Sequence, residues 1–274
     1  MKKYKRALSI AGFDGSGGAG IQADLKTFSA LNCYGMTVLT SLPIQNTTGV
    51  IKIYDLPIES IDKQIESIKE DIGFDVVKIG MLHKPEIIEV VYKKLSECSK
   101  IPIITDPVMF AKSGDLLLEK RALDSLKNKI LPISTIITPN IYEAEYLSNG
   151  KIASKGDMII AADEIAKYGS HFIVIKGGHL EQEENCWDLF YNCKTKESNW
   201  FSNKRIETKN LHGTGCTFSA AIAAYIANKC SIYDSVKNAN YYINKAIDSG
   251  SRYKLGKGCG PVDHFYFMEE IQCK

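Results

Sequence analysis

The stretch Ala7-Leu-Ser-Ile-Ala11 is a short apolar run that leads into the glycine-rich loop Gly12-Phe-Asp-Gly-Ser-Gly-Gly18 and then into a helical pattern from about Ala19 to Leu31. An apolar run bounded by glycines is typical of a buried strand, and a helix directly after it is typical of a βαβ unit. The same alternation continues towards the C-terminus. It predicts an α/β fold with a mainly parallel central sheet that helices cover on both faces.

Apolar periodicity predicts the remaining strands and helices. The expected strands are residues 36–42, 49–54, 76–79, 101–105, 134–138 and 171–175, with a hairpin formed by 187–192 and the residues around Trp200. The expected helices are residues 58–72, 85–95, a segment from about 141, 157–168, 215–228 and 233–249. Ligands of such folds bind beyond the carboxyl ends of the strands, where this chain has its polar and glycine-rich segments.

Composition narrows the function classes. No repeat or linker divides the 274 residues, so we expect a single domain over residues 1–274. The 34 basic and 32 acidic residues leave a formal charge of +2, which gives no long-range attraction to nucleic acid or to an anionic membrane. Neither a signal peptide nor a run of ~20 predominantly apolar residues is present, so we expect a cytoplasmic protein. The eight cysteines include no C-x-x-C pair, which speaks against a disulfide framework or a zinc site.

The loop Gly15-Ser-Gly17-Gly-Ala-Gly20 matches the pattern G-x-G-x-x-G. A dinucleotide site also needs an acidic residue about 20 positions later for the ribose, and residues 35–54 contain no Asp or Glu. A nicotinamide oxidoreductase is therefore disfavoured. The loop either packs a helix on the sheet or lets backbone approach a small ligand, because glycine has no Cβ to block it.

The segment Leu211-His-Gly-Thr-Gly-Cys-Thr217 is the strongest local signal. Gly213 and Gly215 stand just before an apolar helix, whose first N–H groups and dipole would form an anion site suited to phosphate. Cys216 lies in the first turn, where we expect the pKa of its thiol to fall. The alternative is a buried cysteine at a tight helix packing.

Three more segments are suited to phosphate chemistry. Asp106 and Asn140-Ile-Tyr-Glu143 each follow a strand, and Lys176-Gly-Gly178 follows another. The carboxylates of Asp106 and Glu143 could hold Mg²⁺ directly or through water, and Lys176 could neutralise phosphate oxygens. Each residue alone could be a cap or a solvated side chain. Together they predict phosphoryl transfer, which mainly needs positioning and charge neutralisation.

The sequence resembles the hydroxymethylpyrimidine/phosphomethylpyrimidine kinases of thiamine biosynthesis. The segments that carry the resemblance, in the family's order, are Ala11–Phe28, Gln45-Asn-Thr-Thr-Gly49, Lys78-Ile-Gly-Met-Leu82, Asp106-Pro-Val-Met109, Ala111-Lys-Ser-Gly-Asp115, Ile137-Thr-Pro-Asn140, Lys176-Gly-Gly-His179 and His212-Gly-Thr-Gly-Cys-Thr217. The resemblance implies a ribokinase-like three-layer α/β/α fold, and usually a homodimer. It implies two successive ATP-dependent phosphorylations, with Mg²⁺, that convert 4-amino-5-hydroxymethyl-2-methylpyrimidine into its monophosphate and then its diphosphate.

The resemblance also assigns residues. Gln45 would pair with the aminopyrimidine edge, as a Gln amide pairs with adenine. The other pocket residues would be Gly12, Ala19 and Asp24, with Met81 and Val108 on the ring faces. Those at ATP and Mg²⁺ would be Asn140, Glu143 and Lys176, and the anion hole would be Gly213-Thr214-Gly215. Cys216 would take the position of the Asp base of many ribokinase relatives and accept the hydroxymethyl proton.

Two alternatives remain. Pyridoxal kinases of the same subgroup share the glycine loop and the H-G-x-G-C turn. Gln45-Asn-Thr47 and the stretch Met109-Phe-Ala-Lys-Ser113 favour the pyrimidine instead. A non-catalytic pyrimidine-binding protein would not need to retain the transfer groups. His83, His171 and His264 are expected to be structural or solvated, and no role is expected for His179 or His212.

Overall fold

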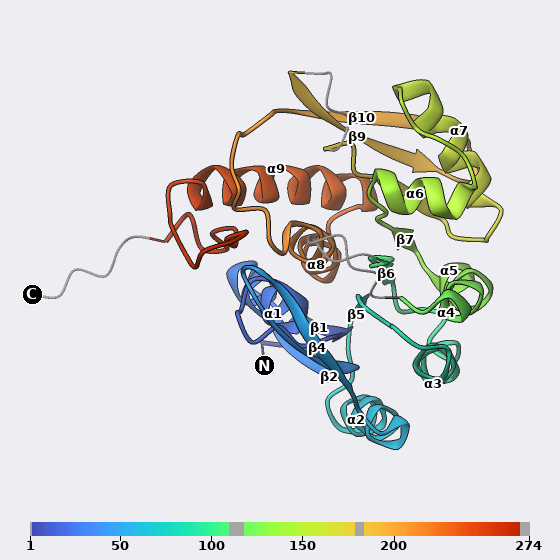
Figure 1. Ribbon diagram of the computed structural model, residues 1–274. Coiled ribbons are helices and arrows are strands. Elements are labelled where there is room, and N and C mark those ends of the chain that lie inside the picture. Colours follow the sequence, from blue (N-terminus) through green and yellow to red (C-terminus); the bar gives the residue numbers. More distant parts are fainter. Residues whose placement is uncertain (1, 110–117, 179–183, 269–274) are drawn as a thin grey trace, which may run out of the picture.

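A computed structural model describes residues 2–109, 118–178 and 184–268; the sequence-based assignments for residues 110–115 and for His179 lie outside these ranges. The described residues form an eight-stranded sheet of order β10-β9-β8-β7-β6-β5-β1-β2 (Figure 1). Its strands are β1 (Arg6–Ala11), β2 (Tyr34–Leu39), β5 (Val76–Ile79), β6 (Ile103–Thr105), β7 (Ile136–Ile137), β8 (Phe172–Ile175), β9 (Asn185–Asn192) and β10 (Ser198–Lys204). The pairs from β2 to β8 are parallel, and the hairpin of β9 and β10 is added antiparallel. The predicted mainly parallel sheet is confirmed.

Helices cover both faces of this sheet because its strands are apolar on both sides. On one face α1 (Gly20–Ala30), α8 (Thr214–Ala227) and α9 (Ile232–Gly250) pack over a core that includes Val76, Ile104 and Val174. On the other face Val77, Ile103 and Ile173 belong to a second core. The helices of that face are α2 (Ile58–Asp71), α3 (Pro85–Leu95), α4 (Lys120–Ser125), α5 (Leu131–Ile133), α6 (Ile141–Ser148) and α7 (Lys155–Ala166) (Figure 1). The three layers are those expected for a ribokinase-like fold.

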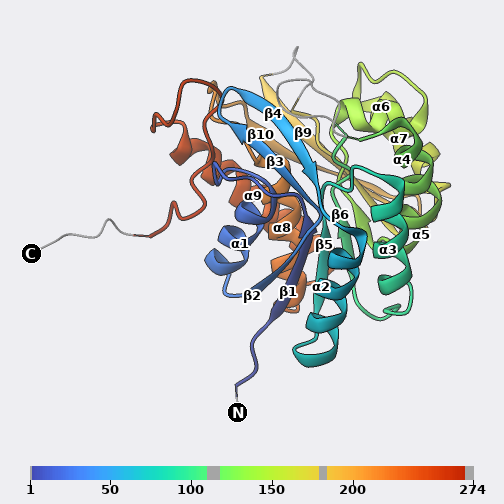
Figure 2. The same ribbon diagram turned by 60° about the horizontal axis from the view of Figure 1, so that its bottom comes forward.

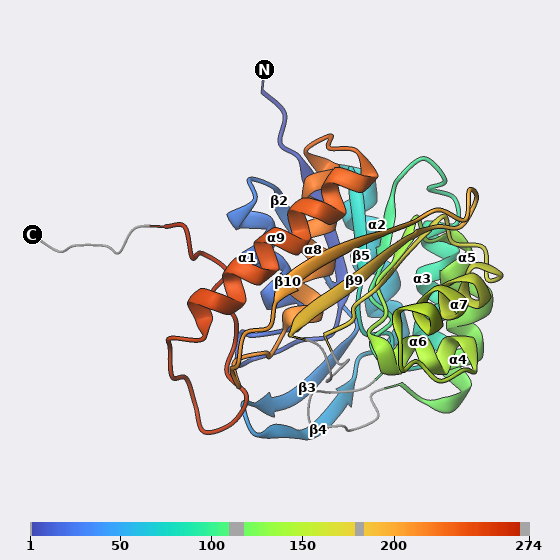
Figure 3. The ribbon, with the colours of Figure 1, turned by 90° about the horizontal axis from the view of Figure 1, so that it is seen from above.

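One expected strand is in fact two. Residues 36–42 were expected to form a single strand, but the chain leaves the main sheet after β2 and forms a separate two-stranded sheet of β3 (Ser41–Asn46) and β4 (Gly49–Asp55). At the break, Thr40 N–H donates to Ala11 O and Phe13 N–H donates to Ser41 O. These bonds to the end of β1 turn the chain, so the β3–β4 hairpin projects from the carboxyl edge of the main sheet (Figures 2 and 3).

Residues 120–133 form a helical segment that the sequence analysis does not predict. It consists of α4, a π-helical turn η1 (Leu126–Ile130) and α5. Ala122, Leu126 and Ile130 are buried four residues apart, which is the helical spacing. In the described ranges, no helix combines the length and apolarity that crossing a membrane requires.

Candidate active site

The glycine-rich loop between β1 and α1 is wrapped around a buried carboxylate, Asp14. Its oxygens accept hydrogen bonds from the N–H groups of Ser16 at 2.9 Å, Gly18 at 3.1 Å and Ala19 at 2.7 Å. Burial alone would raise the pKa of Asp14, but its hydrogen bonds to His212 and Ser16 hold it well below the ordinary value. The amides that a dinucleotide pyrophosphate would need are thus occupied by Asp14, which agrees with the disfavoured oxidoreductase reading.

Asp14 also joins this loop to the predicted anion-binding turn. His212 Nε2 lies 2.8 Å from Asp14 Oδ2 across 198 residues of chain. The next residue, Gly213, has φ +80°, and a Cβ at that position would lie 1.7 Å from Gly18 O. Only glycine allows this contact. The sequence analysis assigns no role to Asp14 or His212, because a pair so distant in sequence leaves no local pattern.

The anion-binding turn opens directly onto the charged residues expected at ATP. Helix α8 begins at Thr214, and among the described residues no side chain caps its first turn. A Cβ on Gly215 would lie 3.1 Å from Asp106 Oδ2 and 3.3 Å from Lys176 Nζ. Gly215 therefore leaves space where the N-terminus of α8, an ammonium and a carboxylate converge. Such an arrangement suits a phosphate group accompanied by a cation.

Asp106 and Lys176 form an ion pair at the ends of β6 and β8. Lys176 Nζ donates to Asp106 Oδ1 at 2.8 Å, and Thr138 Oγ1 donates to the same oxygen at 3.2 Å. Burial acts to lower the pKa of Lys176, but the charges of Asp106 and Glu143 outweigh it and the pKa is raised. Lys176 thus stays charged and able to contact phosphate.

Glu143 is buried behind this pair in a capping box at the start of α6. Its Oε2 accepts from Asn140 N–H at 2.8 Å, and Asn140 Oδ1 accepts from Glu143 N–H at 3.0 Å. Burial raises the pKa of Glu143 to about 7, against the effect of the nearby Lys176 charge. The structure brings Asn140, Glu143 and Lys176 together as predicted.

The expectation of a lowered pKa for the Cys216 thiol is wrong. Burial raises the pKa of its thiol to about 11, and this outweighs the Lys78 charge and a hydrogen bond from Gly20 N–H, which lower it. The charges of Asp24 and Asp106 raise it further. The helix terminus is present, but desolvation of the half-buried Cys216 side chain disfavours its thiolate and outweighs it.

Asp24 is fully buried in an ion pair with Lys78. Lys78 Nζ donates to Asp24 Oδ2 at 2.9 Å, and Ser9 Oγ donates to the same oxygen at 2.5 Å. Asp24 Oδ1 has no hydrogen-bond partner among the residues that the structure describes. Burial raises the pKa of Asp24, although Lys78 and Ser9 counteract it. No role of Lys78 is predicted from the sequence.

Gly12 and Met81, two of the residues expected to bind the acceptor, meet where β1 and β5 end and β3 begins. A Cβ on Gly12 would lie 2.9 Å from Met81 Cε and 3.0 Å from Ser41 Oγ. Ala19, the N-cap of α1, is 3.2 Å (its Cα) from the position of a Gly213 Cβ, so it joins this region to the anion-binding turn. Gln45 is half-buried on β3, and Val108 is half-buried two residues after Asp106.

Two of the histidines expected to be structural or solvated, His83 and His264, are buried beside a polar side chain. His83 is buried and its Nε2 lies 2.6 Å from Asp55 Oδ1. His264 Nε2 lies 3.0 Å from Thr217 Oγ1, and burial lowers the pKa of His264 to about 4.

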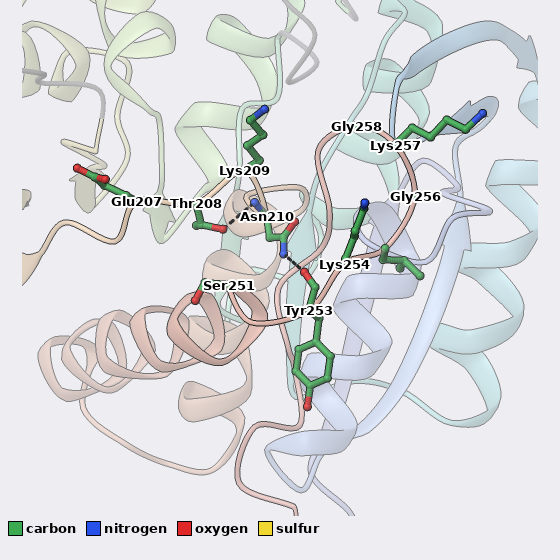
Figure 4. Close-up of a pocket in the computed structure, with 11 residues that line it drawn as sticks. Glu207, Thr208, Lys209, Asn210, Ser251, Tyr253, Lys254, Gly256, Lys257 and Gly258 are labelled. Carbon is green, nitrogen blue, oxygen red and sulfur yellow. Dashed lines mark hydrogen bonds between the residues drawn. The ribbon is translucent and has the colours of Figure 1, made fainter.

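An open pocket of about 660 Å³ adjoins the anion-binding turn, between residues 207–210 and 251–258 (Figure 4). Asn210 crosses its floor and donates to Tyr253 O at 2.7 Å. Three lysines, Lys209, Lys254 and Lys257, line it against one acidic residue, Glu207, so its potential favours anions. One wall is fixed to the β3–β4 turn, because Cys259 N–H donates to Thr47 O at 2.8 Å.

The carboxylates beside the anion-binding turn suit Mg²⁺ only when substrate phosphates supply further ligands. No group of three or more His, Cys, Asp or Glu side chains suited to a metal occurs in the described part of the chain. Asp106 Oδ2, facing Gly215, is the carboxylate oxygen directed at the phosphate space. Mg²⁺ commonly binds through one or two carboxylates plus substrate phosphates and water, which these residues allow.

Comparison with known proteins gives the family. Residues 14–263 match the family model described as phosphomethylpyrimidine kinase. The hydroxymethylpyrimidine/phosphomethylpyrimidine kinase of Rhizobium meliloti is 42% identical over 261 residues, which cover 95% of this chain and 97% of that protein.

Solved structures agree with this match. The pyridoxal kinase of Bacillus subtilis in an ADP complex is 35% identical with a TM-score of 0.89, covering 97% of this chain and 99% of that one. The phosphomethylpyrimidine kinase of Clostridium difficile is 41% identical with a TM-score of 0.78, covering 88% of this chain and 99% of that one. The predicted ribokinase-like fold is confirmed. The chain belongs to the phosphomethylpyrimidine kinase family.

Proposed function

We propose that this enzyme transfers the terminal phosphate of ATP first to the hydroxyl of 4-amino-5-hydroxymethyl-2-methylpyrimidine and then to the resulting monophosphate, as a single catalytic domain in thiamine biosynthesis. The observation that carries the proposal is Gly215, where a Cβ would fill the space that faces Asp106 and Lys176 at the uncapped start of α8. That space suits the transferred phosphoryl group, and the acceptor region around Gly12 is joined to it through Ala19 and Gly213.

The phosphate side of the site needs no covalent intermediate. Hydrogen bonds from the N–H groups of Gly213, Thr214 and Gly215 stabilise the negative charge that builds on the transferred group. Lys176 neutralises phosphate oxygens. Asn140 and Glu143 lie beside the phosphates of the bound nucleotide. Asp106, with Glu143 through water, would hold Mg²⁺, which neutralises charge on the phosphates.

The acceptor side positions the alcohol. Gln45 pairs with the amino group and the adjacent ring nitrogen, Met81 and Val108 contact the ring faces, and Gly12, Ala19 and Asp24 complete the pocket. Cys216 takes the hydroxymethyl proton as the oxygen attacks phosphorus. Because the pKa of this thiol is raised to about 11, the thiolate is scarce at neutral pH but is a strong base once formed.

Pyridoxal kinase is the second candidate, because the Bacillus subtilis structure with the high TM-score of 0.89 is a pyridoxal kinase. The higher identity of the pyrimidine kinases, 42% against 35%, favours the pyrimidine. We test the choice by measuring kcat/KM with Mg-ATP for the pyrimidine alcohol, its monophosphate and pyridoxal. Both pyrimidines are expected to exceed pyridoxal at least tenfold, and phosphorylation of pyridoxal alone would overturn the proposal.

A further inference from the structure

Ser41, the first residue of β3, carries a buried hydroxyl that its surroundings do not satisfy. Its side chain is fully buried, and among the described residues Ser41 Oγ has no hydrogen-bond partner. An unpaired buried hydroxyl destabilises a fold, because it gives up hydrogen bonds to water and receives none in return. Such exceptions call for a reason. The reason here is not the backbone turn, since Ser41 O, not Oγ, accepts the N–H of Phe13 at 3.0 Å.

The location of this hydroxyl points to a ligand. Ser41 Oγ lies 3.0 Å from the position of a Cβ on Gly12, and Met81 Cε lies 2.9 Å from the same position. Because Gly12 has no Cβ, a polar atom and a methionine methyl both pack closely against the backbone at the end of β1. Methionine has three flexible torsions and can move aside when a ring enters. A planar aromatic group would then meet Ser41 Oγ at its edge.

We propose that Ser41 is a specificity-determining residue, whose hydroxyl donates a hydrogen bond to the ring nitrogen that Gln45 leaves free in a heteroaromatic alcohol. The inference rests on the proposed function, which places the acceptor ring between Gly12 and Met81. Pyrimidine acceptors have such a second ring nitrogen. A carbocyclic alcohol of the same shape lacks it and leaves the hydroxyl unpaired.

The strand geometry allows both contacts to one ring. Ser41 and Pro43 are buried, Leu42 is half-buried and Ile44 is exposed, so Ser41 lies on the inward side of β3, and Gln45 is half-buried. Four residues of strand span about 13 Å between Cα atoms. A β-bulge between Ile44 and Gln45 redirects Gln45.

Calorimetric binding to the wild type and Ser41→Ala tests the proposal without requiring turnover. We expect Ser41→Ala to weaken binding of the pyrimidine alcohol about 5- to 10-fold and to leave the affinity for a non-hydrolysable ATP analogue unchanged. The melting temperature of the free protein should stay equal or rise, because an unpaired buried hydroxyl is removed. Ser170→Ala is the control. Ser170 is also buried and has no oxygen or nitrogen partner among the described residues. It precedes β8, at the amino-terminal ends of the parallel strands and so opposite the site.

A matched ligand identifies the bond. An analogue with C–H in place of the free ring nitrogen should bind the wild type 5- to 10-fold more weakly than the pyrimidine, and should bind Ser41→Ala no more weakly than the pyrimidine does. Equal affinity of the pyrimidine for wild type and Ser41→Ala overturns the assignment. If the wild type still phosphorylates the pyrimidine, only the Ser41 inference fails. If Ser41→Ala binds the pyrimidine more weakly than the wild type does, but the wild type transfers no phosphate, the Ser41 inference is supported and the kinase proposal is contradicted.

Discussion

Cys216, Asp14 and His212 show how far single residues depend on distant packing. The helix N-terminus at Cys216 can be predicted from the local sequence, but the pKa of its thiol is raised by desolvation in the folded chain. The Asp14–His212 contact joins two glycine turns that are 198 residues apart. Both effects arise from the folded chain and give no periodic signal.

The role of Cys216 leads to a pH-dependent rate. If the thiolate is the base, kcat of the first phosphorylation rises about tenfold per pH unit below the thiol pKa, which lies at about 11. Cys216→Ala should lower this kcat by about 10²- to 10⁴-fold and flatten the profile, while Cys216→Asp restores part of the rate. The second step attacks through a phosphate oxygen and should be affected less. Near-full first-step kcat in Cys216→Ala would exclude the base role; Cys98→Ala, outside the site, is the control.

Asp14 predicts a pH dependence of stability. Its pKa is lowered on folding from the ordinary 3.8. The stabilisation is therefore fully present above the unfolded value and is lost as the pH falls through the folded pKa. Asp14→Asn should lower the free energy of unfolding by about 3 kcal/mol at pH 7, and the difference from wild type should shrink below about pH 4. Urea unfolding at pH 3–8 measures this difference, with Asp248→Asn as control because the Asp248 side chain is 49% exposed. A difference independent of pH would contradict this pairing.

At the scale of elements, the carboxyl edge of the sheet and the start of α8 form the site together. The βα alternation and the glycine turns made this edge predictable from sequence. The break after β2 was not, because Met36 to Leu42 is uniformly apolar or neutral, and the turn depends on hydrogen bonds from Phe13 and Thr40 to other segments. Periodicity alone carries no information on such contacts.

Gly213→Ala tests the contact between the two glycine turns. The left-handed φ of +80° and the 1.7 Å approach to Gly18 O should together cost about 2–5 kcal/mol or force the turns apart. We expect a lower denaturation midpoint and a kcat reduced by at least 10²-fold for both acceptors. Gly150→Ala is the control, since its Cβ would meet only Ser148 Oγ at 3.6 Å. Wild-type activity in Gly213→Ala would show that the turns need not touch.

At the scale of the whole molecule, the β3–β4 hairpin presents apolar side chains outward. Ile51 is 73% exposed, Tyr54 48% and Ile44 42%. We propose that this face joins two copies in the homodimer implied by the family. Ile51→Asp is expected to shift the protein to monomer in sedimentation equilibrium without loss of helical signal. A wild type that sediments as a monomer at all concentrations, or an unchanged dimer in Ile51→Asp, would contradict this interface.

The central claim is the succession of two transfers to one pyrimidine. The most direct measurement is a ³¹P NMR time course of the wild-type enzyme with Mg-ATP and the pyrimidine alcohol. We expect a monophosphate ester to appear first and then convert to a diphosphate, with two ATP consumed per pyrimidine at completion. Absence of any phosphorylated pyrimidine, with ATP consumed only when pyridoxal is supplied, would contradict it.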